Sequence, residues 1–417
     1  MIDAEIKNLI KKEEHRQKEK LVMIASENYT SKAVREVLGS VLTHKYSEGE
    51  PDRRYYQGNE FVDEIEKLTN RRALKVFGLS EKKWHVNCKA NSASIANLTV
   101  LTALLEPGQK ILSMDLTHGG HLSHGWKLPN GKPIAFSAKI FKVGFYGVEK
   151  KTEIFDYNKI LKLAKKEKPN LIISGGTTYA RDINYKKMAQ IAKSVGAYYF
   201  ADIAHEAGLI AGKALSSPFP FADVVTMSTQ KTLRGPRGSI IICRKDSKDK
   251  IDHALFPGLM GGPSDNVIAA IGVCLKEADT PLFKKYARQT IKNAKILATE
   301  LKKYGFHIVS GGTDKHLVLI DLRHPPAGGK NINGAEAATF LDQAGIVCNK
   351  NTVPFETGSP FRPSGIRLGT PALTTRGMKE KEMKIIARWI KEILLEKKSP
   401  ALVLREVKKL TKKFPVY

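Results

Sequence analysis

Two side chains that could do chemistry together follow two apolar stretches of the sequence. Lys231 comes after the apolar stretch 224–227 and a hydroxyl-rich cluster, 228–230, and Asp202 follows the apolar stretch 197–201. We predict that both apolar stretches are buried parallel strands. Ligands of such sheets lie beyond the carboxyl ends of the strands, which is where Asp202 and Lys231 stand. A lysine sheltered from water suits imine formation, and a carboxylate can keep a pyridine nitrogen protonated. The pair therefore predicts a site for pyridoxal 5′-phosphate (PLP), although a surface lysine and a helix-capping aspartate are the alternatives.

Two serines precede a stretch with a helical pattern and could bind a phosphate group. Ser92 and Ser94 stand just before residues 98–105. Free N–H groups and the dipole at a helix N-terminus attract anions, so we predict that this helix holds the cofactor phosphate. An ordinary serine N-cap is the alternative. The sequence has no P-loop signature, so a nucleoside triphosphate is not indicated.

An arginine and a histidine cluster complete the set of candidate groups. Arg367 lies in an apolar, glycine-flanked stretch, 364–371, and arginine can hold a carboxylate through two parallel hydrogen bonds. An amino-acid substrate would use such a group, whereas an arginine on an edge strand is the alternative. The histidines of 118–124 do not have the spacing of a metal site, so we predict no metal and expect an imidazole to stack on the cofactor ring.

The elements that must position these groups alternate between helical patterns and short apolar strands. We predict strands at 110–114, 171–174, 197–201, 224–227 and 239–243. This alternation indicates an α/β domain with a mostly parallel sheet covered on both faces.

The domain boundaries follow from the changes in this pattern along the chain. We expect a helical arm at 1–25, a large PLP-binding domain at 26–280 and a small α+β domain at 281–417. The polar stretch 26–56 is predicted to be a loop, and a single helix is predicted to run from the Gly/Pro-rich segment 256–263 to about residue 301.

Length, composition and cysteine content restrict the class of protein. A chain of 417 residues is long enough for two or more domains, and no apolar run approaches the roughly 18 residues of a membrane span. Acidic residues within 1–7 argue against a secretory signal, so we expect a cytoplasmic location. The cysteines form no CxxC pair, and we expect reduced, mostly buried thiols at Cys88, Cys243, Cys274 and Cys348.

The net charge of +27 is large, and its origin stays open. Lysines are scattered along helical patterns, as in 162–168, with a further group at 408–413. Scattered lysine is typical of a solvated surface and argues against specific nucleic-acid recognition, which favours clustered arginine with aromatic residues.

Taken together, these segments resemble serine hydroxymethyltransferase, a PLP enzyme of fold type I, the aspartate-aminotransferase-like fold. The resemblance implies a seven-stranded, mostly parallel sheet in the large domain. It extends from about residue 21 to residue 377 and rests on the segments 25–29, 45–49, 54–56, 118–125, 202–205, 229–238, 256–263, 349–351 and 364–371.

The resemblance implies a role for each matching residue. Lys231 would carry PLP, with Asp202 on the pyridine nitrogen, His121 stacked on the ring and His205 near its 3′-oxygen. The cofactor set is completed by Ser92, Ser94, Ser228 and, across a subunit interface, Tyr46, Gly261 and Gly262. The substrate would be bound by Ser26, Arg237, Arg367, Glu48 and Tyr56. The folate contacts would be Tyr55, Leu116, Gly120, Leu122, Asn351, Ser359 and Phe361.

The implied reaction is the reversible conversion of serine and tetrahydrofolate to glycine and 5,10-methylenetetrahydrofolate. Glu48 is the candidate for proton transfer. Because Glu48 and Tyr56 come from the neighbouring subunit in the family, a homodimer or a tetramer is expected. The sequence departs from the family pattern at Gln230, Ala93, Met260 and Asn266.

Two other functions compete with this interpretation. A threonine aldolase of the same fold would act without folate, and it would not need residues such as Glu48, Tyr55, Asn351 and Phe361. A basic nucleic-acid-binding protein on a retired enzyme fold would have lost catalytic groups, whereas the set here is whole. The sequence does not distinguish tetrahydrofolate from a modified pterin.

Overall fold

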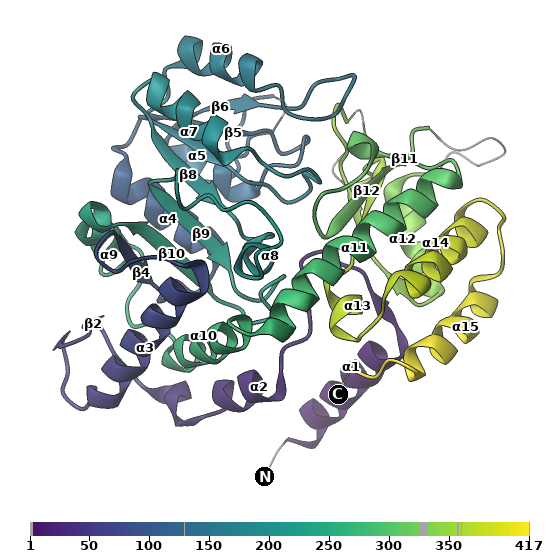
Figure 1. Cartoon of the computed structure of the whole chain (residues 1–417), viewed down its shortest axis with the longest axis horizontal. Helices are drawn as coiled ribbons and strands as arrows, with labels where there is room; N and C mark the ends of the chain where they lie inside the picture. Colours follow the sequence, from purple (N-terminus) through teal and green to yellow (C-terminus); the bar gives the residue numbers. More distant parts are fainter. Residues whose placement is uncertain (1–2, 129, 325–331, 357, 360, 417) are drawn as a thin grey trace. The chain divides into compact units, whose positions relative to one another are not determined.

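The computed structural model describes residues 3–416, except 129, 325–331, 357 and 360 (Figure 1). Its contacts divide the chain into two compact units. The large unit is Thr30–Arg288, and the small unit combines Met1–Tyr29 with Gln289–Tyr417. Helix α11 (Pro281–Lys303) contributes to both.

Within the described part of the large unit, a seven-stranded sheet has the order β4-β10-β9-β8-β7-β5-β6. Strand β10 is antiparallel to both of its neighbours, and the other pairs are parallel, as the alternation in the sequence predicts. The strands are β4 (Trp84–Asn87), β5 (Lys110–Met114), β6 (Lys142–Tyr146), β7 (Leu171–Ser174), β8 (Tyr198–Asp202), β9 (Val224–Ser228) and β10 (Ser239–Arg244).

Helices cover both faces of this sheet (Figure 1). Successive strand residues point to opposite faces, so Val224 packs in one core and Val225 in the other. One core includes residues of α3, α6, α7, α8 and α10, and the other includes residues of α4 and α9. The helices of this unit are α2 (Lys32–Leu38), α3 (Glu60–Phe77), α4 (Ala93–Leu104), α5 (Phe136–Ile140), α6 (Tyr157–Glu167), α7 (Tyr185–Ser194), α8 (Ala207–Ala211), α9 (Lys248–Leu255) and α10 (Asp265–Ala278).

The described residues of the small unit include a four-stranded antiparallel sheet in the order β11-β12-β15-β14. Strand β15 lies inside this sheet, so Arg367 is not on an edge strand. Strands β1 and β13 of this unit pair in parallel as a separate two-stranded sheet. The strands are β1 (Leu21–Val22), β11 (His307–Ile308), β12 (Leu317–Asp321), β13 (Ile346–Val347), β14 (Asn349–Asn351) and β15 (Gly365–Gly369). The helices are α1 (Ala4–Glu19), α12 (Gly334–Gln343), α13 (Pro371–Thr375), α14 (Glu380–Leu394) and α15 (Pro400–Lys412).

Two predictions about local structure were wrong. The single helix expected up to residue 301 is two helices, because α10 ends at Ala278 and Pro281, which has no N–H to donate, begins α11. The expected loop 26–56 contains α2, which Ser31 caps by accepting a hydrogen bond from the backbone N–H of Val34. It also contains the two-stranded hairpin β2 (Gly49–Glu50) and β3 (Arg53–Arg54).

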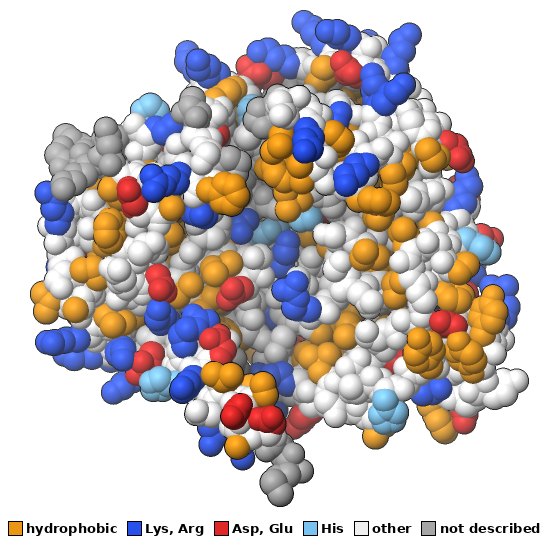
Figure 2. Space-filling model, turned by 180° about the vertical axis from the view of Figure 1, so that it is seen from behind, with side chains coloured by type: hydrophobic (Ala, Val, Ile, Leu, Met, Phe, Trp, Pro, Cys, Tyr) orange, Lys and Arg blue, Asp and Glu red, His pale blue; other side chains and the backbone are white. Residues whose placement is uncertain are grey.

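The distribution of charge on the surface and the hydropathy of the helices are relevant to nucleic-acid and membrane partners. On the face that Figure 2 shows, lysine and arginine side chains are spread among acidic and apolar ones and do not form one patch. Among the helices of the described residues, none is long and apolar enough to cross a membrane.

Candidate functional site

The two charged groups predicted from the sequence are buried at one edge of the large sheet. Asp202 is the last residue of β8 and is 5% exposed, and Lys231 follows β9 and is 9% exposed. Asp202 lies opposite Thr226 in the parallel β8–β9 register, so both strands end at this edge. At the end of neighbouring β7, Gly175 has a φ of +121°, and a Cβ there would lie 2.0 Å from the backbone oxygen of Asp202. Only glycine fits so close to the carboxylate's backbone.

Three donors hold the Asp202 carboxylate. The backbone N–H of Ala204 donates to Oδ1 at 2.9 Å, while Nδ2 of Asn97 donates to Oδ2 at 2.8 Å. His124 Nε2 also lies 2.9 Å from Oδ2. Burial by itself raises the pKa of Asp202, but the hydrogen bonds from His124 and Asn97 hold it well below its ordinary value. The group is therefore ionised near neutral pH.

His121 is a neutral imidazole beside this carboxylate. Burial lowers its pKa to about 4; the neighbouring His124 and Lys231 act in the same direction, while Asp202 opposes them. Its Nδ1 accepts a hydrogen bond from the backbone N–H of Ser123 and lies 2.7 Å from Ser123 Oγ. A neutral ring fits the predicted stacking role.

The ligand atoms of His121, His124 and Asp202 lie within 4.8 Å of one another, close enough for one metal ion. The contact between His124 and Asp202, however, already joins two of these atoms as a hydrogen bond. The arrangement therefore serves as a support for the Asp202 carboxylate.

Helix α4 begins at the residues of the predicted anion site. It begins at Ala93, earlier than the sequence pattern indicated, so Ser94 lies in its first turn. Ser92 is the N-cap, and its Oγ accepts a hydrogen bond from the backbone N–H of Ile95 at 3.3 Å. The same helix end can therefore be capped by a serine and also bind an anion.

The groups at this edge fit PLP. A buried amine, an ionised carboxylate, a neutral imidazole and a helix N-terminus match the aldehyde, ring nitrogen, ring face and phosphate of the cofactor. Within the described residues, the buried Oε1 of Gln230, next to Lys231 in the chain, has no hydrogen-bond partner, as expected where a ligand is to be bound.

A second group of predicted residues forms what we call the tyrosine cluster, made of Tyr46, Glu48, Tyr56, Gly261 and Gly262. The Tyr56 hydroxyl donates to Glu48, and this hydrogen bond raises the pKa of Tyr56 to about 12. The rings of Tyr46 and Tyr56 lie 6.1 Å apart, edge to face. A Cβ on Gly261 would lie 3.1 Å from Glu48 Oε1, and one on Gly262 would lie 3.2 Å from the Tyr46 ring. The structure thus brings all five residues together.

A buried charge network fixes the backbone that carries Glu48. Arg54 donates to the carbonyl oxygens of Ser47 and Gly49 at 2.9 and 2.8 Å, and it pairs with Glu66 on α3 at 2.7 Å. The ammonium group of Lys89 also lies 3.4 Å from the Gly49 oxygen. The main chain on both sides of Glu48 is therefore held in place.

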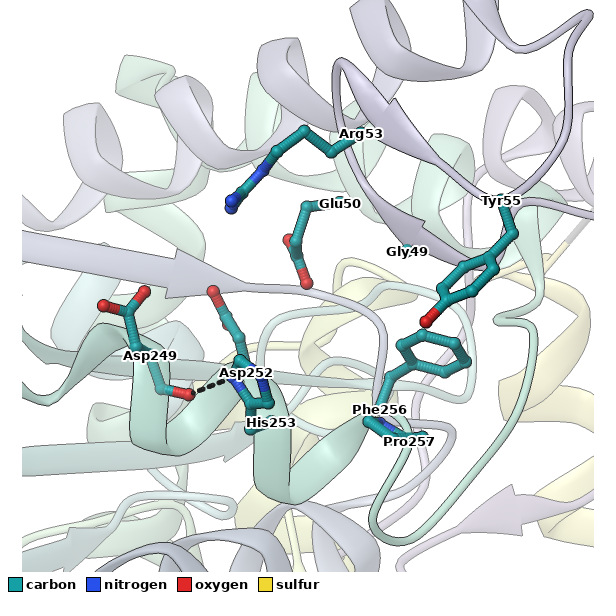
Figure 3. A pocket seen from close by; sticks show the side chains of 9 residues that line it. All are labelled: Gly49, Glu50, Arg53, Tyr55, Asp249, Asp252, His253, Phe256 and Pro257. Atoms are coloured by element: carbon teal, nitrogen blue, oxygen red, sulfur yellow. Dashed lines mark hydrogen bonds between the residues drawn. The ribbon is translucent and has the colours of Figure 1, made fainter.

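Tyr55 lines a cavity of about 230 Å³ next to the tyrosine cluster (Figure 3). Figure 3 shows its ring beside that of Phe256; the two centroids are 5.8 Å apart and the rings meet edge to face at an interplanar angle of 72°. Phe256 was not among the site residues predicted from the sequence. Its place beside the Gly/Pro-rich segment 256–263 was the available signal.

In the small unit, Arg367 lies buried in β15. Its Nε donates to Asn349 Oδ1 at 3.0 Å, and burial lowers its pKa to about 10. Gly369 of the same strand donates its N–H to the carbonyl oxygen of Met23, which brings the segment of Ser26 beside β15. The candidate carboxylate-binding residues Arg367 and Ser26 therefore belong to adjacent segments of one unit.

The other predicted site residues are divided between the units. Asn351 (in β14), Ser359 and the exposed Phe361 belong to the small unit. The remaining ones belong to the large unit, where Leu122 and Arg237 are exposed and His205 and Ser228 are buried. Leu116 and Gly120 lie in the turn after β5, where the backbone N–H of Gly120 donates to the Asp115 oxygen at 2.8 Å.

Comparison with protein families agrees with this geometry. The family described as "SHMT: Serine hydroxymethyltransferase" matches residues 1–390 of the 417-residue chain. The chain belongs to the serine hydroxymethyltransferase family. The predicted fold type I is confirmed, and the activity is the reversible conversion of serine and tetrahydrofolate to glycine and 5,10-methylenetetrahydrofolate. Serine hydroxymethyltransferases use PLP as cofactor and tetrahydrofolate as co-substrate.

Sequence reasoning missed the residues that support the Asp202 carboxylate. Asn97 and His124 touch its carboxylate but stand 105 and 78 residues away in the chain. His124 was part of the histidine cluster but had no role. Asn97 lies one helical turn after the serines of the anion site, and that spacing was the signal.

Proposed function

We propose that the large sheet edge is the cofactor site of the enzyme, with Lys231 as the residue that holds PLP covalently. The observation that carries this proposal is the pair of buried groups, the Lys231 amine and the Asp202 carboxylate, at the ends of adjacent parallel strands. When bound, PLP supplies an electron-accepting ring that stabilises negative charge at the substrate α-carbon.

Each neighbouring side chain has a definite task in this site. Asp202, held as a carboxylate, keeps the ring nitrogen protonated, and neutral His121 stacks on the ring face. Ser92 and Ser94, with the N-terminus of α4, bind the phosphate. Ser228 and His205, both buried in the large unit, would complete the cofactor contacts, with His205 as the contact for the 3′-oxygen.

Arg367 and Ser26 bind the substrate carboxylate, with Arg237 as a further contact. An arginine fork gives this carboxylate both charge and orientation. Burial lowers the pKa of Arg367 to about 10, so it remains a cation near neutral pH.

Glu48 moves the proton at the hydroxymethyl group or at the folate nitrogen. A carboxyl at hydrogen-bond distance from a tyrosine can give and take protons, and the Tyr56 hydroxyl orients it. Tyr55, with Phe256, forms an aromatic wall for the folate. Its other contacts are Leu116, Gly120, Leu122, Asn351, Ser359 and Phe361.

We further propose that the enzyme is a homodimer, or a tetramer built from it, in which the tyrosine cluster serves the neighbouring subunit. Large apolar side chains are unusually exposed around this cluster: Val41 78%, Tyr46 61%, Tyr55 72% and Phe61 77%. Such a patch is typical of an interface. In the small unit, Ile6, Leu9 and Ile10 are exposed on α1 and form a separate set of apolar side chains that a second copy could cover.

The cysteines support a location in a reducing compartment. Cys88, Cys243, Cys274 and Cys348 are free thiols, which suits the cytoplasm.

An absorption spectrum of the purified protein tests the proposed function. PLP bound at Lys231 gives a band in the visible region, and we expect glycine to produce a new long-wavelength band only after tetrahydrofolate is added. A spectrum that responds to glycine but is indifferent to tetrahydrofolate would contradict the proposed folate site. A protein that takes up no PLP would contradict the cofactor site itself.

A further inference from the structure

One buried amide connects several parts of the proposed cofactor site in the large unit. Asn97 belongs to α4, whose first turn is the anion site, and its side chain is fully buried. Its Nδ2 donates to Asp202 Oδ2 at 2.8 Å and to Ser123 Oγ at 2.9 Å. Its Oδ1 accepts from Thr226 Oγ1 at 2.6 Å. Both hydrogens of the amide and its oxygen are therefore in use.

The partners of Asn97 lie on the elements that carry the other cofactor contacts. Asp202 ends β8, Thr226 lies on β9, which leads to Lys231, and Ser123 contacts the imidazole of His121. The position of α4 is thus linked, through one side chain, to the carboxylate, the lysine strand and the stacking histidine.

Thr226 fixes which way the amide faces. Its hydroxyl donates to Oδ1, so the NH₂ group must point toward Asp202. A flipped amide would place Oδ1 against the carboxylate and would lose the bond from Thr226. Because Thr226 is completely buried, water cannot replace that bond without a rearrangement.

We propose that Asn97 is a positioning residue, oriented by Thr226, that sets the Asp202 carboxylate relative to the phosphate-binding end of α4. The inference rests on the proposed function of this site. A carboxylate that already accepts a hydrogen bond from Asn97 is a weaker base, so the proton that it shares with a ring nitrogen stays on the ring. Asn97 thereby affects both how tightly the cofactor is held and where that proton lies.

The test compares PLP binding and ring protonation in three variants. Asn97→Ala removes the donor, Thr226→Val removes only the group that orients it, and Thr99→Val is the control. Thr99 is a fully buried residue of α4 whose hydroxyl bonds the carbonyl oxygen of Ile95 and touches neither Asp202 nor Thr226 in the hydrogen bonds described. The Kd of PLP for the cofactor-free protein and the ¹⁵N shift of ring-labelled PLP in the holoenzyme are measured.

We expect Asn97→Ala to weaken PLP binding about 10- to 100-fold, as the loss of a hydrogen bond to a charged group does. Thr226→Val should weaken it by about 2- to 10-fold, and Thr99→Val should leave it unchanged. In the first two variants the ¹⁵N shift should move toward the value of an unprotonated ring. A merely structural role would lower the melting temperature without moving that shift.

Unchanged ¹⁵N shift and Kd in Asn97→Ala, with normal binding by the unmodified chain, would overturn this inference and leave the proposed function intact. If Asn97→Ala does not fold, the same result in Thr226→Val overturns it. An unmodified chain that does not bind PLP would overturn the proposed function together with the inference.

Discussion

The sheet edge of the large unit and its tyrosine cluster carry proposed active-site residues in opposite ways. Asp202 and Lys231 are buried, and three donors of the same chain hold the carboxylate. Tyr46 and Tyr56 are largely exposed, although the backbone around Glu48 is anchored by Arg54. One chain therefore buries the proposed lysine and carboxylate of its cofactor site but leaves the two tyrosines of the cluster exposed, where we propose that a second copy uses them.

Removal of the Lys231 amine should impair only the buried site at the sheet edge. We expect Lys231→Ala to lower turnover by more than about a thousand-fold, because a covalent catalytic group is lost. Absorption after dialysis should show no retained PLP. Lys213→Ala is a matched control, because Lys213 bonds the carbonyl oxygen of Val76 and should leave the cofactor in place. Retention of covalent PLP by Lys231→Ala would contradict the assignment.

Removal of the Glu48 charge should impair only the tyrosine cluster. Glu48→Gln should lower kcat by about 10²- to 10⁴-fold, the usual contribution of a proton-transfer group, with normal PLP content. Steady-state kinetics with serine and tetrahydrofolate measure this. Glu64→Gln, at an exposed position on α3, should behave like the unmodified enzyme. An equal loss of PLP in Glu48→Gln would show that the two regions are not functionally separate.

Arg367, in the small unit, is the proposed binding group for the substrate carboxylate. Arg367→Lys keeps the charge but loses the planar fork, so we expect the KM for serine to rise about 10- to 100-fold. The exposed Arg362 provides a control in Arg362→Lys. A change in kcat alone, at constant KM, would argue that Arg367 does not bind the substrate carboxylate.

The buried His121 and Asp202 should also make the stability of the protein depend on pH. The pKa of His121 falls from 6.5 to about 4 on folding, so the unfolded chain binds more protons between these values. Acidification from pH 6.5 to 4 therefore lowers the stability of the cofactor-free protein, and the lowered pKa of Asp202 continues this loss at still lower pH. Thermal unfolding over this range measures it. His121→Phe should reduce the slope, and an unchanged slope would contradict a buried neutral imidazole.

Much of the framework could be predicted from the sequence, because buried strands are short runs of β-branched and aromatic residues. The strand before Asp202 and the strand before Lys231 were placed within a residue of β8 and β9. The break between α10 and α11 was missed, because the apolar pattern continues on both sides of it. Pro281 was the local signal.

The support of the site could not be predicted in the same way. Asn97 and Asp202 meet only because α4 packs against β9, and no local pattern encodes a contact between residues 105 positions apart. The roles of Glu48 and Tyr56 came from the family resemblance. Their hydrogen bond is a property of the folded hairpin region and is not visible in the spacing of residues.

The most direct test of a site shared between two copies is to mix two inactive variants. Lys231→Ala keeps the tyrosine cluster, and Glu48→Gln keeps the cofactor site, so a mixed dimer has one intact site. Random reassociation should restore activity at about one site in four. No activity, although differently tagged chains are recovered together as mixed dimers, would show that Glu48 and Lys231 act within the same chain and would contradict the account.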